Sequence, residues 1–177
     1  TLENKYSKPV ELGIGVGLIF NMTKNQRLKW DLGVNYNNYK INTSFISGNS
    51  SIPSQYNLYY VSFKTGPYFS VVNHSRIKLQ LHAHSSLDHL ISGSNQYMDR
   101  YIDLNTDKSF SKLVFNANYG ATLEVVLSDS NSFYISFDSK NSITNAIEAD
   151  QSYRLNSTSI LAGLRFKLNK IQNPQIH

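Results

Sequence analysis

Hydrophobic and polar residues alternate along most of the chain, so that every second side chain has the same character. In residues 10–21, for example, Leu12 and Ile14 share one face, and Gly13 and Gly15 share the other. A period of two is typical of β-strands whose two faces meet different surroundings, and no segment keeps a helical period for more than a turn or two. The pattern predicts an all-β chain with seven strands, at residues 9–21, 28–45, 56–72, 76–91, 110–127, 132–144 and 157–168.

The connections between the predicted strands alternate in length. Short ones lie at 22–27, 73–76 and 128–132, and longer ones at 46–55, 92–109 and 145–157. This alternation is expected when antiparallel strands run up and down around a closed barrel, with tight turns at one rim and loops at the other. Many predicted strands have 12 residues or more, whereas strands in ordinary sheets most often have about 5–6. The predicted fold is therefore an up-and-down antiparallel β-barrel.

Composition indicates which face of the barrel is apolar. Charged residues make up only 16% of the 177 residues, and the polar strand positions are mostly Gly, Asn, Ser and Thr. The water-facing side of a soluble, lipocalin-like barrel should instead be rich in Lys and Glu. Small polar residues suit the crowded interior of a narrow membrane barrel, whose outer face is apolar. The pattern favours a transmembrane barrel, and a soluble ligand-binding barrel remains the alternative.

Charged and aromatic residues support the membrane barrel. The charges on the polar face have mixed sign, and we expect them to pair across the interior, because an unpaired buried charge costs several kcal/mol. Aromatic residues gather near predicted strand ends, as in the interfacial belts of membrane barrels. They are Trp30 near a short turn and Tyr36, Tyr39, Tyr56, Tyr59 and Tyr60 near a long loop. The net charge of +5 is scattered without a basic run, so no nucleic-acid partner is expected, and the lack of cysteine excludes disulfides and a cysteine nucleophile.

Seven strands are one short of the even number expected for a bacterial single-chain barrel. We expect an eighth strand upstream of Thr1, and we interpret residues 1–9 as the end of a long loop. Without that strand, the edge of segment 9–21 should be open or paired with another chain. The barrel domain would span residues 1–168, followed by a polar tail at 169–177.

The order of several segments resembles a known family. "GIGVGLIF" (13–20), "LKWDLGVNY" (28–36), "GPYFS" (66–70) and the closing "LAGLRFKL" (161–168) follow one another as in the PorT-like outer-membrane β-barrel family of Bacteroidota. This family is related in shape to OmpA/OmpX-type barrels, and the resemblance covers residues 9–168. It implies eight strands, a side-chain-filled interior and no general enzymatic activity, with some members in secretion or other outer-membrane assemblies. The chain departs from the family by lacking the first strand and by ending in a polar tail.

The segment "LQLHAHSSLDHL" (79–90) concentrates candidate chemistry on one strand. His82, His84, Ser86 and Asp88 fall on its polar face. The first interpretation is structural, with these side chains hydrogen-bonded inside the barrel. The second is a lipid A-modifying hydrolase that uses His84 as base and Ser86 as nucleophile. The third is a metal site in which both histidines share an ion with Asp88 or Asp138. The structural interpretation is preferred, so no catalytic residue, metal ligand or cofactor is predicted.

These observations predict a non-enzymatic small barrel in the outer membrane of a Gram-negative bacterium, with a structural, anchoring or interaction role. An eight-stranded barrel is too narrow for a solute channel, because side chains fill it. The expected partners are outer-membrane lipid, lipopolysaccharide and other outer-membrane or secretion-complex proteins. The predicted loop "QYMDRYIDLNTDK" (96–108) is the best candidate contact surface.

Overall fold

The computed structural model describes residues 3–6, 10–47, 50–97, 100–104, 111–145, 154 and 156–167. These residues form β-strands joined by turns, which confirms the all-β prediction. The strands are β1 (Glu3–Tyr6), β2 (Val10–Asn21), β3 (Leu28–Ser47), β4 (Ser50–Asn73), β5 (Ile77–Tyr97), β6 (Arg100–Asp103), β7 (Leu113–Val126), β8 (Asn131–Ser142) and β9 (Ser157–Lys167). Within the described ranges, no helix combines the length and the apolar character needed to cross a membrane.

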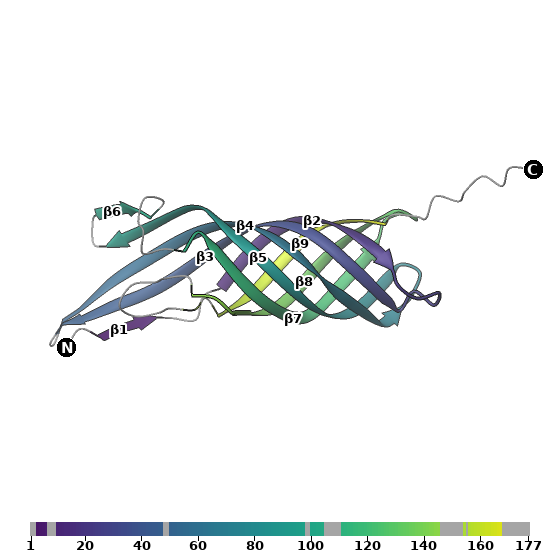
Figure 1. Ribbon diagram of the computed structural model, residues 1–177, viewed down its shortest axis with the longest axis horizontal. Helices are drawn as coiled ribbons and strands as arrows, with labels where there is room; N and C mark the ends of the chain where they lie inside the picture. The colour runs from purple at the N-terminus through teal and green to yellow at the C-terminus, as the bar shows by residue number, and fades with distance from the viewer. Residues whose placement is uncertain are drawn as a thin grey trace, which may run out of the picture.

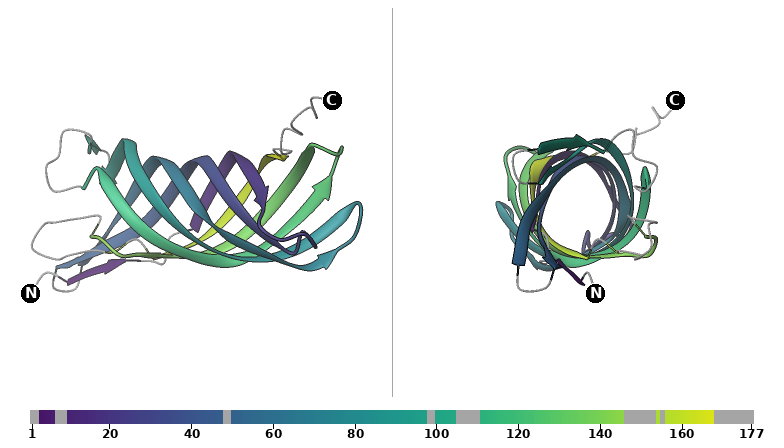
Figure 2. Two further views of the ribbon diagram at one scale, coloured as in Figure 1. Left: turned by 45° about the vertical axis from the view of Figure 1, so that its right-hand side comes forward. Right: turned by 90° about the vertical axis from the view of Figure 1, so that its left-hand side faces the viewer.

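Seven of these strands close into a ring, which we call the barrel. Antiparallel pairing joins β2 to β3, β3 to β4, β4 to β5, β5 to β7, β7 to β8 and β8 to β9. β9 then pairs with β2 and closes the ring, which is viewed end-on in Figure 2. The connections at 22–27, 74–76 and 127–130 lie at one end, the right-hand end in Figure 1, which we call the short-turn end. We call the opposite end the long-connection end.

The ring closes through a parallel pairing of β2 with β9, which runs from Val10 opposite Thr158 to Ile19 opposite Lys167. The two backbones lie close together, and a Cβ added at Gly163 would run into the carbonyl oxygen of Gly15. Glycine fits this close approach because it has no side chain to place there. The prediction that the edge of β2 is open or held by another chain is wrong in this structure, because β9 occupies that edge. The predicted eighth strand upstream of Thr1 is tested by no described residue and stays a prediction.

A disulfide across the β2–β9 seam tests the closure. Leu12 and Ile160 are register partners, and both side chains are exposed on the outer face. We expect the Leu12→Cys/Ile160→Cys variant to form an intramolecular disulfide on mild oxidation, because paired strands bring Cα atoms into the range that a disulfide spans. Migration on a non-reducing denaturing gel reports the bond. The matched pair Leu12→Cys/Leu123→Cys places the second cysteine on β7 and should stay reduced. A failure of the first pair to cross-link would mean that β2 and β9 are separated in solution.

The seven predicted strands are confirmed, but two of the predicted long loops are wrong. The segment 46–55 is a hairpin instead, since β3 runs to Ser47 and β4 begins at Ser50. In the segment 92–109, β5 continues to Tyr97 and pairs with β6. Both segments lie between the stretches of clear alternation and contain several Ser, Asn and Gly residues, but pairing with neighbouring strands extends the sheet into them.

Of the segments predicted as loops or tail near the ends of the chain, the structure describes only part. The predicted loop at 1–9 contains β1, which pairs with β3 beyond the point where β2 begins. Most of the predicted loop at 145–157 lies outside the described residues, and so does the predicted tail at 169–177.

At the long-connection end, β3, β4 and β5 continue past the ring and pair with β1 and β6 to form an open sheet, which we call the projecting sheet (Figure 1). Its inner side and the adjoining rim of the barrel enclose an apolar cluster. The cluster consists of Tyr39, Ile41, Tyr56, Leu58, Tyr60, Leu90, Leu104 and Val114. The predicted interfacial belt is therefore wrong for Tyr39, Tyr56 and Tyr60, whose side chains are buried in this cluster. Trp30 and Tyr36 do lie exposed on the outer face, and the Tyr36 and Tyr59 rings stack at 6.1 Å.

Candidate functional site in and around the barrel

Along the barrel strands, apolar side chains point outward and polar side chains point inward. Burial alternates residue by residue, as in β8, where every second side chain is buried. The outward set includes Leu32, which is 44% exposed, and Phe63, which is 59% exposed. The inward set includes Arg165, which is 1% exposed. A protein that folds in water buries its apolar side chains, so this barrel has the reverse polarity.

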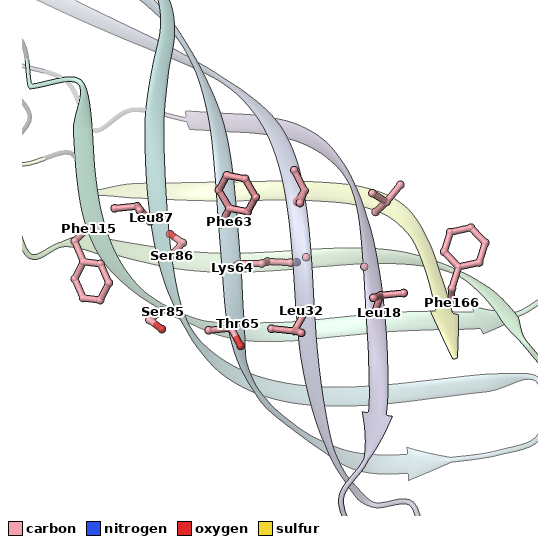
Figure 3. Close-up of a pocket in the computed structure, with 14 residues that line it drawn as sticks. Leu18, Leu32, Phe63, Lys64, Thr65, Ser85, Ser86, Leu87, Phe115 and Phe166 are labelled. Carbon is pink, nitrogen blue, oxygen red and sulfur yellow. The ribbon is translucent and has the colours of Figure 1, made fainter. Parts of the chain in front are cut away.

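The outer surface carries apolar grooves between rows of outward side chains. One groove of about 730 Å³ lies between two such rows. Figure 3 shows its lining, which includes Leu18, Leu32, Phe63, Leu87, Phe115 and Phe166. Thr65 and Ser85 are polar residues of this lining and are register partners on β4 and β5. Trp30 Nε1 donates a hydrogen bond to Thr65 Oγ1 over 2.8 Å, which satisfies the indole N–H on an otherwise apolar face.

Inside the barrel, toward the short-turn end, Arg165 is the centre of a charge cluster. Its Nη1 donates to Glu124 Oε2 over 3.0 Å and to Gln80 Oε1 over 3.1 Å. The guanidinium carbon lies 4.5 Å from the ring centre of Tyr68 and 4.6 Å from that of Tyr134, so the cation is held between two aromatic faces. These contacts come from four strands of the ring and tie its walls together across the interior.

His82 and His84 lie at the middle of the interior, where their rings stack at 4.6 Å. Tyr68 packs against both rings. His82 Nε2 contacts the carboxylate of Asp138, and its Nδ1 lies 3.2 Å from Thr122 Oγ1. Hydroxyl, imidazole and carboxylate thus follow one another in the order used by hydrolytic triads. Thr122, however, is fully buried and donates its hydrogen bond to Ser136, so a substrate has no approach to the hydroxyl.

The pair proposed for a hydrolase is not assembled. Ser86 Oγ accepts hydrogen bonds from the amides of Asn116 and Asn118, at 3.4 Å and 3.2 Å, and the structure places no hydrogen bond between Ser86 and His84. Both residues lie on the inner face, away from the apolar exterior. His84 Nε2 has no hydrogen-bond partner among the described residues.

The residues proposed as metal ligands are also divided between two clusters. Asp138 contacts His82, whereas Asp88 accepts a hydrogen bond from Lys140. Within the described ranges, no three His, Cys, Asp or Glu side chains are grouped closely enough to hold a metal ion.

Toward the long-connection end, Lys140 bridges the interior. Its Nζ donates to Glu11 Oε1 over 2.8 Å, to Asp88 Oδ2 over 3.0 Å and to Tyr39 OH over 2.6 Å. Tyr39 in turn donates to Asp88, and Ser157 donates to Glu11. Glu11, Asp88 and Lys140 are all buried, and they come from strands β2, β5 and β8. The predicted pairing of charges across the interior is confirmed here and at Arg165.

Between these clusters lies a cavity of about 10 Å³. Its lining includes Asn35, Asn37, Asn118, His84 and Ser159, each with a buried polar atom that has no hydrogen-bond partner among the described residues. A cavity of this size holds about one water molecule. The polar interior is therefore packed with side chains at this level.

Sequence reasoning selected His82, His84, Ser86 and Asp88 because they are close together along one strand. Alternation also places Lys140 and Arg165 on the polar face, among the charges expected to pair across the interior. Their partners lie on strands far away in the sequence, so alternation cannot identify which carboxylate each cation meets.

Comparison with family models, with curated proteins and with solved structures gave no match for this chain. The resemblance to PorT-like barrels therefore stays a prediction.

Proposed function

We propose that this chain is a small outer-membrane β-barrel protein with a structural, anchoring or interaction role, of the PorT-like kind. The observation that carries the proposal is the reversed polarity of the barrel. Its exterior presents Leu, Ile, Val and Phe side chains, whereas charged side chains such as Lys140 and Arg165 are buried inside. Such an apolar exterior is stable in the hydrocarbon core of a bilayer. Because lipid offers no hydrogen-bond partners, the closed sheet must pair the backbone N–H and C=O groups itself.

Strand length supports the same proposal. β2, β7, β8 and β9 contain 12, 14, 12 and 11 residues. A tilted strand needs about 9–11 residues to cross the hydrocarbon core of a bilayer. The projecting sheet then extends beyond the bilayer on the side of the long connections, and it offers the surface through which a larger outer-membrane complex would be contacted.

The interior gives little support to the rival functions. A ligand-carrying barrel needs an apolar or open interior, but this one is polar and filled by side chains such as Tyr68 and Arg165. A lipid hydrolase needs a nucleophile that opens toward lipid, but Ser86 faces inward and its hydroxyl is bonded to two asparagine amides. An anchoring or interaction role requires neither a cavity nor a nucleophile.

Extraction behaviour tests the proposal. We expect the protein to stay in the membrane pellet after a wash with alkaline carbonate or urea and to be released by detergent. The unheated sample should migrate faster than the boiled sample on a denaturing gel, because a closed β-barrel resists unfolding by the detergent until it is heated. A soluble protein expressed in the same cells serves as the control and should be absent from the washed pellet. Release by carbonate without detergent would contradict the proposal.

A further inference from the structure

Basic side chains gather inside the short-turn end of the barrel. Lys29, Lys78, Arg165 and Lys167 stand near the ends of β3, β5 and β9 that border this opening. Lys29 interacts electrostatically with Glu124, which attracts it, and with the like charges of the other three, which repel it. We call these four residues the basic mouth.

The basic mouth has too few carboxylates for its charge. Glu124 accepts a hydrogen bond from Lys78 Nζ over 3.3 Å and another from Arg165 Nη1 over 3.0 Å. Asp31, deeper in the barrel, lies 3.7 Å from Arg165 Nε and 3.9 Å from Lys64 Nζ, so it is shared between two cations as well. The long-connection end shows the opposite balance, since Lys140 contacts two carboxylates there.

Two donors of the basic mouth make no hydrogen bond with the described residues. Lys29 is only 3% exposed, yet it makes no hydrogen bond or ion pair with any described residue. Arg165 Nη2 is buried and has no hydrogen-bond partner among the described residues. Burying several cations around one shared carboxylate is costly, and a charge-assisted hydrogen bond to an oxyanion would offset part of that cost.

We propose that the basic mouth binds an oxyanion, a phosphate or carboxylate group held by Lys29 and Lys78 against the guanidinium of Arg165. Such a group would supply the negative charge that Glu124 alone does not provide, and its oxygens would accept hydrogen bonds from these two donors. The anion could be free in solution or carried by an acidic side chain of a partner protein. The proposal does not depend on the location of the barrel, so it can fail or succeed independently of the proposed membrane function.

Titration of the purified full-length protein in a non-ionic detergent tests the site. The probes are inorganic phosphate and acetate, added at constant ionic strength and followed by calorimetry and by the thermal unfolding temperature. We expect saturable binding of at least one probe, with a rise in unfolding temperature. The Lys29→Met variant keeps the aliphatic stem and should weaken binding by about 10-fold or more, which corresponds to about 1.4 kcal/mol.

Lys24→Met is the matched control, because Lys24 lies exposed in the turn 22–27 at the same end of the barrel. This variant should bind the probe with an affinity within about twofold of the wild type. If Lys29→Met does not fold, Lys78→Met removes a more exposed cation of the same mouth and should also weaken binding. Preference for phosphate over acetate would indicate a phosphate ligand, and the reverse would indicate a carboxylate. Absence of saturable binding to the wild type, or equal binding by Lys29→Met, would overturn the proposal.

Discussion

Phe63→Lys is expected to lower the free energy of unfolding by about 2–4 kcal/mol in lipid vesicles, the cost of a cation on the lipid face near the bilayer midplane. Phe63 is 59% exposed and lies opposite Val34 and Leu87, in the central part of the barrel wall. In a soluble barrel, a lysine at such an exposed position would change stability by less than about 0.5 kcal/mol. Denaturant unfolding of vesicle-inserted protein, followed by tryptophan fluorescence of Trp30, measures the difference.

Met22→Lys is the control for Phe63→Lys. Met22 is apolar and 58% exposed, but it lies in the turn 22–27 at the short-turn end instead of on the barrel wall. A cation there would remain in contact with water, so the expected change is within about 0.5 kcal/mol. Equal and small effects at both positions would show that the exterior of the barrel meets water, and would remove the basis of the proposed membrane location.

Lys140→Met is expected to destabilise the protein by about 3–5 kcal/mol, because it leaves Glu11 and Asp88 buried without their cation. The methionine keeps a similar length, so the loss reports the charge and its hydrogen bonds more than a change in packing. The free energy of unfolding at neutral pH measures the effect. The result depends on the contacts of Lys140 Nζ with both carboxylates and with Tyr39.

Two further variants separate charge from packing at Lys140. Adding Glu11→Gln to Lys140→Met removes one of the two abandoned carboxylates and should recover part of the lost stability. Lys40→Met changes an exposed lysine on the outer side of β3 and should have little effect. If Lys140→Met is no more destabilising than Lys40→Met, the buried ion cluster does not hold the interior together.

The strands and their faces could be predicted because a period of two is a local signal. Alternation places Leu12 and Ile14 on the apolar face, composition turns that face outward, and the structure exposes both side chains. Composition identified the inner face because Gly, Asn and Ser are small enough to crowd together. Gly33 shows this directly, since a Cβ there would press on the side chain of Lys64.

Features that depend on contacts between distant segments could not be predicted. The extension of β3 and β4 through 46–55 depends on cross-strand pairing, whereas the composition of that segment is typical of a loop. The closure of β2 against β9 joins segments nearly a whole chain apart, and alternation does not identify a strand's partner. The inward tyrosines were misplaced for a related reason, since Tyr39 and Tyr60 fill the apolar cluster of the projecting sheet and do not lie at a lipid interface.

The candidate chemistry was placed on the correct strand, but its partners were not predicted. Asp138 was considered as a ligand shared by two histidines, but only His82 reaches it. His84 instead stacks on His82 and packs at a tilt against Tyr68. Gly66 leaves the room for this arrangement, because a Cβ there would collide with the backbone and ring of His84. The sequence of β5 alone cannot show whether the carboxylate of Asp138, on β8, will contact His82 or His84.

The ring has an odd number of strands, and this determines where groups fused to its first and last strands would lie. β2 enters the ring beside β1 at the long-connection end, and β9 leaves it at Lys167 beside the opposite opening. In a ring with an even number of up-and-down strands, entry and exit share one side. Here seven strands run the length of the ring, so the polypeptide enters the ring at one opening and leaves it at the other, and groups fused before β2 and after β9 would lie at opposite ends of the barrel.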